Sequence, residues 1–412
     1  MKGITVLVLD AEAKTGPTTV RTLGREGARV LAAAPPGPPA PAQHSRYVAG
    51  RLTHPDPLRH PDGLIEWLDA TLDQHRPDCV LPMTEYTIRA LDRHRDVFAD
   101  RTALALPPTE ALPIAFDKER LLALAATMGV EAPKTWRPAS LDEAYALGPE
   151  LPYPVYVKAR ESYSSASKNP RFARGRFTHT QEDYRRLYEE LDGLSALPLV
   201  QETVPGHVFK VDAVYRNGEP VDLFCQEVFR TWPISGGYGV MRRSVAPKDA
   251  PAEEAKRLMA ALAWTGPAEV EFLMDERDGT PRLLEINGRF WASVEFAHYC
   301  GVPIAPDTVR VAMGLEPMGA ASYRVGAWMR WPEGDLKRLY AALLMRHRLA
   351  GEVLRLPGRL EALRDLIWDA RPGVHQDDFY LDDPLPALAL MARTITLGRK
   401  PTDPGAPPPT RD

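Results

Sequence analysis

The first part of the chain alternates short apolar runs with amphipathic segments. Each apolar run is typical of a buried parallel strand, and each amphipathic segment is typical of a helix. These elements cover, in chain order, residues 4–9, 17–26, 29–34, 64–75, 79–82 and 84–93. The repeated strand–helix–strand order predicts a doubly wound, Rossmann-like parallel sheet over residues 1–113.

The pattern then changes from parallel units to hairpins. Residues 117–128 predict a helix that Gly129 ends, and residues 131–200 predict a small α+β lid. Longer strands joined by glycine-containing turns follow, over 209–215, 221–229, 268–274 and 282–286. We therefore expect an antiparallel-sheet domain over residues 114–315 that carries the lid.

Residues 316–412 predict a helical C-terminal region, because amphipathic stretches occupy 335–347 and 360–368. Proline is frequent in the chain and gathers partly in a PPGPPAP run over 35–41 and in the tail from about residue 400. We interpret the first run as a surface loop and the tail as disordered. The expected fold class is α/β and α+β, built from a parallel-sheet domain, a lid, an antiparallel-sheet domain and a helical region.

Composition and charge exclude several classes of function. Lys and Arg number 51 against 55 Asp and Glu, so no field of the whole protein attracts nucleic acid or anionic lipid. No stretch approaches the ~18 apolar residues that a membrane helix needs, and three distant cysteines predict a reducing compartment, the cytoplasm. The first turn, DAEAKTGPTT, has a single glycine where a dinucleotide fingerprint needs three.

Acidic side chains gather on one predicted hairpin, in GPAEVEFLMDERDGTPRLLEINGRFWAS. Strand alternation places Glu271 on one strand and Glu285 with Asn287 on the next, at a spacing that brings their oxygens together. Paired carboxylates in a half-buried sheet repel each other unless a cation joins them, and this all-oxygen set suits Mg²⁺. For Glu269 alone we prefer an ordinary exposed acid.

Two lysines and a hinge-like turn point to a phosphate-bearing ligand. Lys158 ends the apolar strand PVYVK, and Lys118 lies in the first turn of a helix, where the helix dipole disfavours a cation unless an anion is bound. In LVQETVPG, Gln201 and Glu202 follow a strand and suit contacts to an adenine edge. Each feature has an alternative: edge-strand lysines are common, Lys118 fits a solvated face, and a polar turn explains the hinge equally well.

Together these motifs resemble the ATP-grasp superfamily, which includes biotin carboxylase and the large subunit of carbamoyl phosphate synthetase. The resemblance covers about residues 1–315. The motifs FDKERLL, YVKAR, QETVPG and LLEINGRFWAS stand in the order of that family. The resemblance implies ATP and Mg²⁺ as cofactors, with two ions expected and Mn²⁺ as an alternative. It implies that Glu271, Glu285 and Asn287 bind the metal, that Lys118, Lys158, Gln201, Glu202 and the backbone of Val204 bind ATP, and that Arg289 faces the reacting phosphate.

Within that superfamily the chain is similar to carboxylate-amine ligases. The implied reaction activates a carboxylate as an acyl phosphate and joins it to an amine, releasing ADP and phosphate. Its partners are then a small carboxylate and a small amine. The alternatives are a phosphotransferase or carboxylase on the same fold, or an inactive nucleotide-binding sensor. The lid loop has Ser164, Ser165 and Ser167 where relatives are usually glycine-rich, and position 288 is Gly where proline is common.

Three further groups of residues carry weaker hypotheses. Arg230, Arg242 and Arg243 flank the glycine-rich TWPISGGYGVMRR and suit a wall that binds a substrate carboxylate, although solvated loop arginines are as good an explanation. The run His375 to Asp378 suggests a metal site, but a turn is the commoner explanation. The tryptophans at 328, 331 and 368 would line an interface if the chain forms a homodimer.

Overall fold

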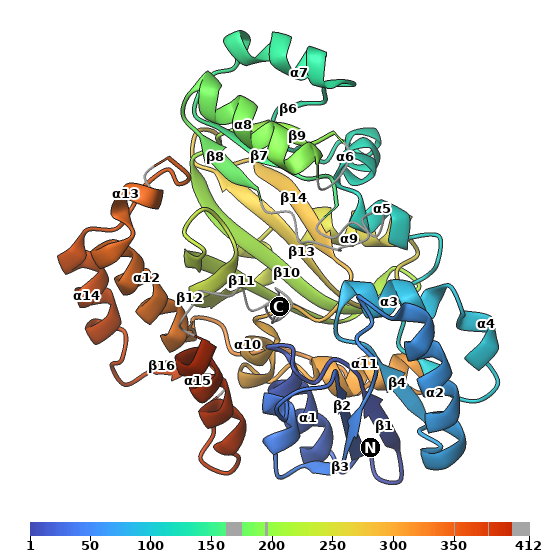
Figure 1. Cartoon of the computed structure of the whole chain (residues 1–412). Helices are drawn as coiled ribbons and strands as arrows, with labels where there is room; N and C mark the ends of the chain where they lie inside the picture. Colours follow the sequence, from blue (N-terminus) through green and yellow to red (C-terminus); the bar gives the residue numbers. More distant parts are fainter. Residues whose placement is uncertain (162–174, 194–196, 350, 378, 398–412) are drawn as a thin grey trace.

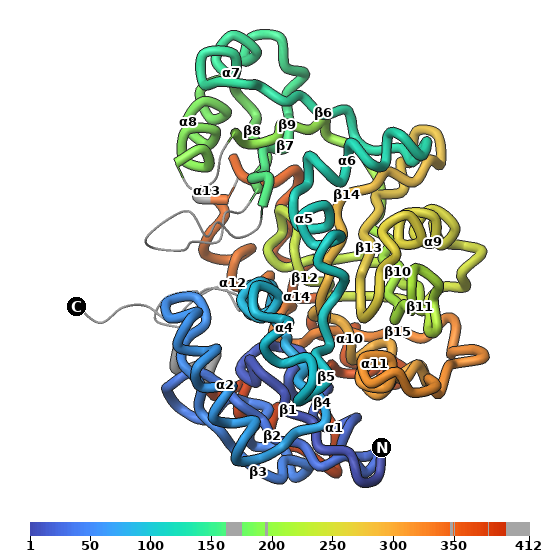
Figure 2. Tube along the Cα trace, turned by 90° about the vertical axis from the view of Figure 1, so that its right-hand side faces the viewer, coloured from blue at the N-terminus to red at the C-terminus, as the bar shows by residue number. Residues whose placement is uncertain are grey.

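The computed structural model describes residues 1–161, 175–193, 197–349, 351–377 and 379–397 (Figure 1). Three sheets organise this part of the chain, and C-terminal helices stand beside the largest one. The parallel sheet lies at one end of the molecule and the small sheet at the other, with the large sheet between them (Figures 1 and 2). The expected fold class is confirmed.

The N-terminal sheet is parallel throughout, in the order β3-β2-β1-β4-β5. Its strands and helices are β1 (Thr5–Val8), α1 (Gly16–Arg25), β2 (Arg29–Ala34), η1 (Pro41–His44), β3 (Val48–Thr53), α2 (Pro61–His75), β4 (Cys79–Leu81), α3 (Glu85–Asp92), α4 (Arg95–Phe98) and β5 (Ala103–Leu104). The edge strand β3 was not predicted, because its half-exposed sequence VAGRLT lacks an apolar run. Strands β1 and β4 are buried apart from Thr5, as is typical of a parallel sheet that is covered on both faces.

A small antiparallel sheet, in the order β6-β9-β7-β8, forms the second layer. Two helices precede this sheet in the chain, α5 (Leu112–Phe116) and α6 (Lys118–Thr127). The strands of the sheet and the helices between them are β6 (Thr135–Trp136), α7 (Leu141–Leu147), η2 (Gly148–Glu150), β7 (Val155–Lys158), β8 (Arg176–Thr178), α8 (Gln181–Asp192) and β9 (Leu199–Glu202). Buried Tyr184 and Tyr188 pack α8 onto the sheet. The predicted serine loop, with Ser164, Ser165 and Ser167, lies outside the described residues.

The large sheet runs in the order β14-β13-β10-β11-β12-β15-β16. Its elements and covering helices are β10 (Gly206–Arg216), β11 (Glu219–Trp232), β12 (Tyr238–Val245), η3 (Pro247–Asp249), α9 (Ala252–Ala261), β13 (Gly266–Asp275), β14 (Pro281–Asn287), α10 (Val294–Tyr299) and α11 (Ile304–Ala312). Strand β12 corrects the expectation of a glycine-rich loop that carries Arg242 and Arg243. Both arginines lie within this strand, which pairs with β11 and β15.

The C-terminal region is only partly helical. It contains β15 (Trp328–Arg330), α12 (Pro332–Leu344), α13 (Arg346–Leu349), α14 (Arg359–Trp368), β16 (Val374–Gln376) and α15 (Leu385–Leu397). The two strands extend the large sheet, and three residues are too few to give a periodic signal. The expected disordered tail lies outside the described residues. In the described part of the chain, no helix has both the length and the apolar character needed to cross a bilayer.

Candidate active site

A cavity of about 2280 Å³ opens where the three sheets meet. Loops that follow β1, β2, β3 and β4 line one wall, which is the carboxyl edge where parallel sheets present ligand sites. Strands β7, β10, β13 and β14 line the opposite wall, and residues of the C-terminal region close one side. Nearly all the predicted nucleotide and metal residues face this one space.

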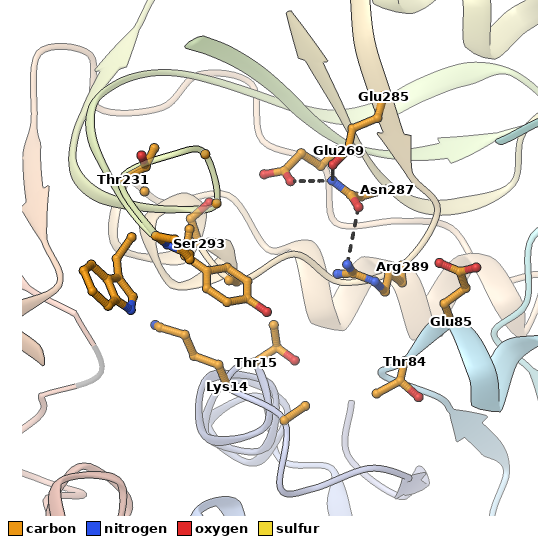
Figure 3. A pocket seen from close by; sticks show the side chains of 18 of the residues that line it. Lys14, Thr15, Thr84, Glu85, Thr231, Glu269, Glu285, Asn287, Arg289 and Ser293 are labelled. Carbon is orange, nitrogen blue, oxygen red and sulfur yellow. Dashed lines mark hydrogen bonds between the residues drawn. The ribbon is translucent and has the colours of Figure 1, made fainter. Parts of the chain in front are cut away.

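The acidic hairpin assembles as its sequence predicts. Glu271 on β13 pairs with Glu285 on β14, and Glu269 pairs with Asn287. The Nδ2 of Asn287 donates to Glu269 at 3.1 Å and to Glu285 at 3.3 Å (Figure 3). It also donates to Glu271 at 3.1 Å. Glu269 is almost fully buried, so our preference for an exposed acid at this position is wrong. The hairpin therefore brings three carboxylates to one amide.

Lys210 of β10 also belongs to this cluster, although no sequence motif indicated it. Its Nζ lies 2.7 Å from Glu271 and 3.1 Å from Glu269, because β10 pairs directly with β13. The side chain is buried, and the two carboxylates outweigh that burial and hold the pKa of Lys210 above its usual value. The signal in the sequence was the polar pair Lys210 and Asp212 alternating within an otherwise apolar strand.

The three glutamates of the cluster differ in their pKa values, because burial and neighbouring charges act on each of them differently. Burial, with Glu269 and Glu285 nearby, raises the pKa of Glu271 to about 8, although Lys210 opposes the change. Burial also raises the pKa of Glu269. For Glu285 burial acts in the same direction, but Lys118, Lys158 and Lys210 outweigh it and lower its pKa. Glu285 therefore releases its proton at a lower pH than Glu271.

This donor set fits a divalent cation that is also bound by a ligand. Glu271, Glu285 and Asn287 supply hard oxygen donors, and a cation would offset both the burial and the repulsion that raise the pKa of Glu271. Among the described residues, no three His, Cys, Asp or Glu side chains form a complete metal-binding group. Mg²⁺ commonly takes one or two carboxylates and completes its shell with phosphates and water. The residues therefore suit Mg²⁺ bound with a nucleotide.

The two predicted lysines approach the same hairpin from different elements. Lys158, at the end of β7, donates to the backbone oxygen of Leu284 at 3.3 Å, and Lys118, at the start of α6, lies 3.5 Å from Glu285. Both are buried. Burial, and next the charge of Lys118, lowers the pKa of Lys158 to about 7. Two buried lysines beside the same hairpin favour an anionic ligand such as a polyphosphate.

Local contacts hold both lysines in place. Asp117 caps α6, accepting from the backbone N–H groups of Glu119 and Arg120 at 2.9 and 3.3 Å. Arg160, two residues beyond Lys158, donates to Asp117 at 2.8 Å, and its backbone oxygen accepts from Lys118 N–H at 3.0 Å. The end of β7 and the start of α6 are therefore joined directly, so the two lysines hold one relative position.

The predicted hinge residues line the cavity, but their side chains already have partners. Gln201 is buried and donates to Thr135 at 2.9 Å, while Glu202 accepts from the backbone N–H of Lys134 at 2.9 Å. Val204 is buried beside them. These contacts anchor β9 to β6. Their roles toward adenine stay predictions, and backbone groups are the part of this segment best suited to them.

Arg289 follows the hairpin and faces the cavity. Its Nη2 donates to Asn287 Oδ1 at 3.3 Å and its Nη1 to the backbone oxygen of Phe290 at 2.9 Å. Glu85, at the start of α3, lies on the opposite wall and points toward Arg289 (Figure 3). Burial raises the pKa of Glu85, while Arg89, Arg289 and Lys118 oppose the change. No motif marked Glu85, because only the fold brings α3 to the hairpin.

The three arginines proposed for the substrate carboxylate do not form one wall. Arg230 reaches the cavity, but it also pairs with Asp369 at 2.6 Å and Asp335 at 3.2 Å. Arg242 and Arg243 are not among the described residues that line the cavity. Arg242 is buried against Asp377 at 2.6 Å, and Arg243 pairs with Glu227 at 2.6 Å. Asp335, Asp369 and Asp377 come from segments distant in sequence, while Glu227 lies opposite Arg243 on the neighbouring strand β11.

The residues suggested for a second metal site and for a tryptophan interface make contacts within the fold instead. His375 lies in β16, stacked on Tyr299 with ring centroids 4.0 Å apart, and Asp377 accepts from Lys14 at 2.9 Å. Asp378 is outside the described residues. Of the three tryptophans, Trp331 is buried and Trp368 is 66% exposed, so they do not form one surface.

Packing explains why position 288 is glycine. A Cβ at this position would meet the ring of Trp264 at 2.5 Å, which is closer than side chains approach.

Comparisons of sequence give distant relatives, and no family model matches the chain. The carbamoyl phosphate synthase large chain of Vibrio vulnificus (strain CMCP6) is 24% identical over 274 residues, which is 61% of this chain. The multifunctional protein URA2 of Saccharomyces cerevisiae is 25% identical over 196 residues, 46% of this chain. The chain spans only 24% and 8% of the length of these two curated relatives.

Similar solved structures cover a larger share of this chain than the sequence relatives do. Biotin carboxylase from Campylobacter jejuni, in a β-γ-ATP complex, superposes with a TM-score of 0.61 at 15% identity, covering 78% of this chain and 74% of that one. The biotin carboxylase domain dimer of Hydrogenobacter thermophilus 2-oxoglutarate carboxylase, with MgADP, ADP and bicarbonate, gives 0.60 at 14% identity over 78% and 73%. L-amino acid ligase from Bacillus licheniformis gives 0.56 at 16% identity over 77% and 76%.

The protein therefore has the ATP-grasp fold, as the resemblance of its motifs indicated. Carboxylases and ligases share this fold, so the fold leaves the reaction open. The Campylobacter jejuni structure contains β-γ-ATP, and the Hydrogenobacter thermophilus structure contains MgADP and ADP.

Proposed function

We propose that the protein is an ATP-dependent carboxylate-amine ligase. The observation that carries the proposal is the convergence of Glu271, Glu285 and Asn287 with Lys118 and Lys158 in one cavity. Two buried lysines beside a carboxylate cluster suit a triphosphate with its cation. The products would be an amide, ADP and phosphate, in the class C–N bond formation.

In this proposal each side chain has a definite task. Lys118 and Lys158 hold the phosphates, and Glu271, Glu285 and Asn287 would hold Mg²⁺, which neutralises charge on the transferring phosphoryl group. The substrate carboxylate attacks the γ-phosphorus and ADP leaves, giving an acyl phosphate. An amine then attacks the acyl carbon, phosphate leaves, and the amine loses one proton. Arg289 is placed to stabilise the oxyanion of the second step.

The position of Arg289 also suits the first step. Its guanidinium donates to Asn287 and therefore lies beside the proposed metal ligands. It faces Glu85 on the N-terminal wall, so a substrate between the two walls would meet both groups (Figure 3). Among the three predicted substrate arginines, Arg230 is the one that lines this cavity, and of those three we retain it alone, as a second contact for the acid besides Arg289.

The test uses hydroxylamine as the amine with a panel of carboxylic acids, in the presence of ATP and Mg²⁺. We expect an acid-dependent hydroxamate, formed in step with phosphate release. Glu285→Gln removes one metal ligand and should lower the rate at least 100-fold. Glu276→Gln is the matched control, because Glu276 is 60% exposed on the turn of the same hairpin; its rate should stay within about twofold.

The alternatives give different results. A rate in Glu285→Gln equal to that of the unaltered protein would contradict the metal assignment. Phosphate release that no acid changes, with no hydroxamate, would favour the sensor. A phosphorylated product or bicarbonate-dependent turnover would favour a phosphotransferase or a carboxylase.

A further inference from the structure

The N-terminal wall of the cavity contains an apolar surface that the proposed chemistry does not use. We call Pro36, Pro39, Leu58, Trp67 and Tyr86 the proline wall, because the proline-rich loop after β2 forms its rim. Both prolines are exposed and Trp67 is half-buried, so apolar area faces the open cavity. Apolar surface inside a ligand cavity is where the apolar part of a ligand gains most by leaving water.

Contacts behind the proline wall hold it in place. Asp10, which follows β1, accepts from the backbone N–H groups of Met83 and Thr84 at 3.1 Å and from the hydroxyl of Thr87 at 2.7 Å. These bonds fix the turn that presents Tyr86. A pocket that is organised before binding loses less entropy when a ligand enters.

Trp67 has its own support from a buried histidine. The ring of His54 lies 5.6 Å from that of Trp67, and the Nδ1 of His54 is 2.8 Å from the backbone oxygen of Pro55. His54 is 1% exposed, so it cannot swing away from this position without disturbing the core. The indole therefore keeps a constant orientation at the edge of the cavity.

The proline wall is continuous with the proposed reaction centre. Tyr86 follows Glu85 directly in the first turn of α3, and Glu85 also lines a smaller hollow together with Glu285 and Arg289. A ligand whose carboxylate lies at Arg289 would extend along the start of α3 toward Trp67. The wall therefore suits the body of the molecule that reacts at Arg289, next to the hollow that Lys118 also lines.

The charged groups near the proline wall narrow the ligand further. The carboxylates of Glu12, Asp56 and Glu85 line the same part of the cavity, as do Lys14 and Arg59. Asp56 pairs with Arg59 at 3.8 Å and Glu85 pairs with Arg89 at 2.8 Å, so these charges largely balance one another. A second carboxylate or a phosphate on the ligand's far end would instead lose hydration against the apolar wall, and an apolar end meets no such penalty.

We infer that the proline wall binds the side group of the acid substrate, and that this substrate is a monocarboxylic acid with an aromatic or branched apolar group. The inference rests on the proposed function, since it names the class of acid that the ligase would activate. A dicarboxylic acid is disfavoured because its second carboxylate would lose hydration against the apolar wall. A very small acid leaves the wall in contact with water.

The first experiment separates the acid site from turnover. Isothermal titration measures binding of 3-phenylpropionate, phenylalanine, acetate, succinate and glutamate to the full-length protein with a non-hydrolysable ATP analogue and Mg²⁺. We expect at least one of the two phenyl acids to bind at least tenfold more tightly than every other acid, because apolar pocket contacts discriminate by about 10–200-fold. Equal or weaker binding of both phenyl acids would overturn the inference, whether or not the protein turns over.

The second experiment tests the wall itself with the acid that binds best. Trp67→Ala should weaken its binding about tenfold or more, and the double variant Pro36→Ser with Pro39→Ser should weaken it in the same direction. The double variant changes exposed residues, so it keeps the test valid if Trp67→Ala does not fold. Pro372→Ser is the control, because Pro372 is exposed and is not among the described residues that line the cavity.

The results distinguish the two proposals. Tight binding of a phenyl acid that the wall variants weaken, without any hydroxamate, would support the wall and contradict the ligase. Hydroxamate formation that prefers succinate or glutamate would support the ligase and overturn the wall. Unchanged affinity in both wall variants would also overturn it.

Discussion

Lys210 offers the sharpest test of how the acidic hairpin is held together. It is 5% exposed, and its ammonium contacts Glu271 at 2.7 Å and Glu269 at 3.1 Å. Lys210→Met keeps a similar length and removes the charge, which leaves two buried carboxylates without their cation. Loss of one partner from a buried ion pair costs about 3–5 kcal/mol. For a domain of about 200 residues this corresponds to a fall in Tm of roughly 10 °C.

Thermal and urea unfolding of the full-length protein at pH 7 measure this loss. Lys256→Met is the matched control, because Lys256 pairs with Glu253 on the exposed face of α9 and should cost less than about 1 kcal/mol. Adding Glu271→Gln to Lys210→Met removes one of the stranded charges. We expect this second change to recover part of the lost stability, so the two changes are strongly non-additive.

Two results would refute this reasoning. If Lys210→Met costs no more than Lys256→Met, the ammonium does not neutralise the carboxylates in the folded protein. If Glu271→Gln adds its own loss to that of Lys210→Met, Lys210 acts through packing rather than charge. Mg²⁺ with a bound ATP analogue should also raise the Tm of Lys210→Met more than that of the unaltered protein, since a cation would then restore the lost charge.

Two further predictions concern stability. Gly288→Ala should destabilise the protein by about 1–3 kcal/mol, because its methyl group would meet the fully buried ring of Trp264 at 2.5 Å; Gly351→Ala, where a Cβ meets nothing within 4 Å, is the control in the same unfolding assay. Partial burial of His298 lowers its pKa to about 4 from 6.5, so between these values the unfolded chain binds a proton that the folded chain does not bind. Stability should fall by up to about 3 kcal/mol as pH drops through that window, His298→Gln should flatten the decline, and titration of this imidazole near pH 6.5 would contradict the expectation.

The hairpin shows why part of the site was predictable from sequence. Glu271, Glu285 and Asn287 lie on two neighbouring strands joined by one turn, so alternation and turn chemistry alone determine which side chains meet. Lys118 and Lys158 were found for a similar reason, since each marks the end of a clear helix or strand. Their closeness to one another is a tertiary fact, made by the bond between Arg160 and Lys118.

Residues without a local signal were missed or misplaced. Glu85 and the proline wall belong to the N-terminal domain, and only the packing of that domain against the large sheet makes them part of the cavity. Arg242 was expected in a loop at the site, yet it lies in β12 and binds Asp377, which is far along the chain. A buried arginine takes whichever acid the fold brings near, and sequence distance gives no measure of that.

The amino-acid sequence by itself determined the order of layers, the acidic hairpin and the positions of both lysines. Each of these depends on periodicity, turns or helix ends, which are interactions over a few residues. The tertiary structure decided which charges pair, how far each pKa moves, and which surfaces enclose the cavity. Those properties depend on burial and on distances between strands such as β10 and β13, whose register is set by packing of the whole sheet.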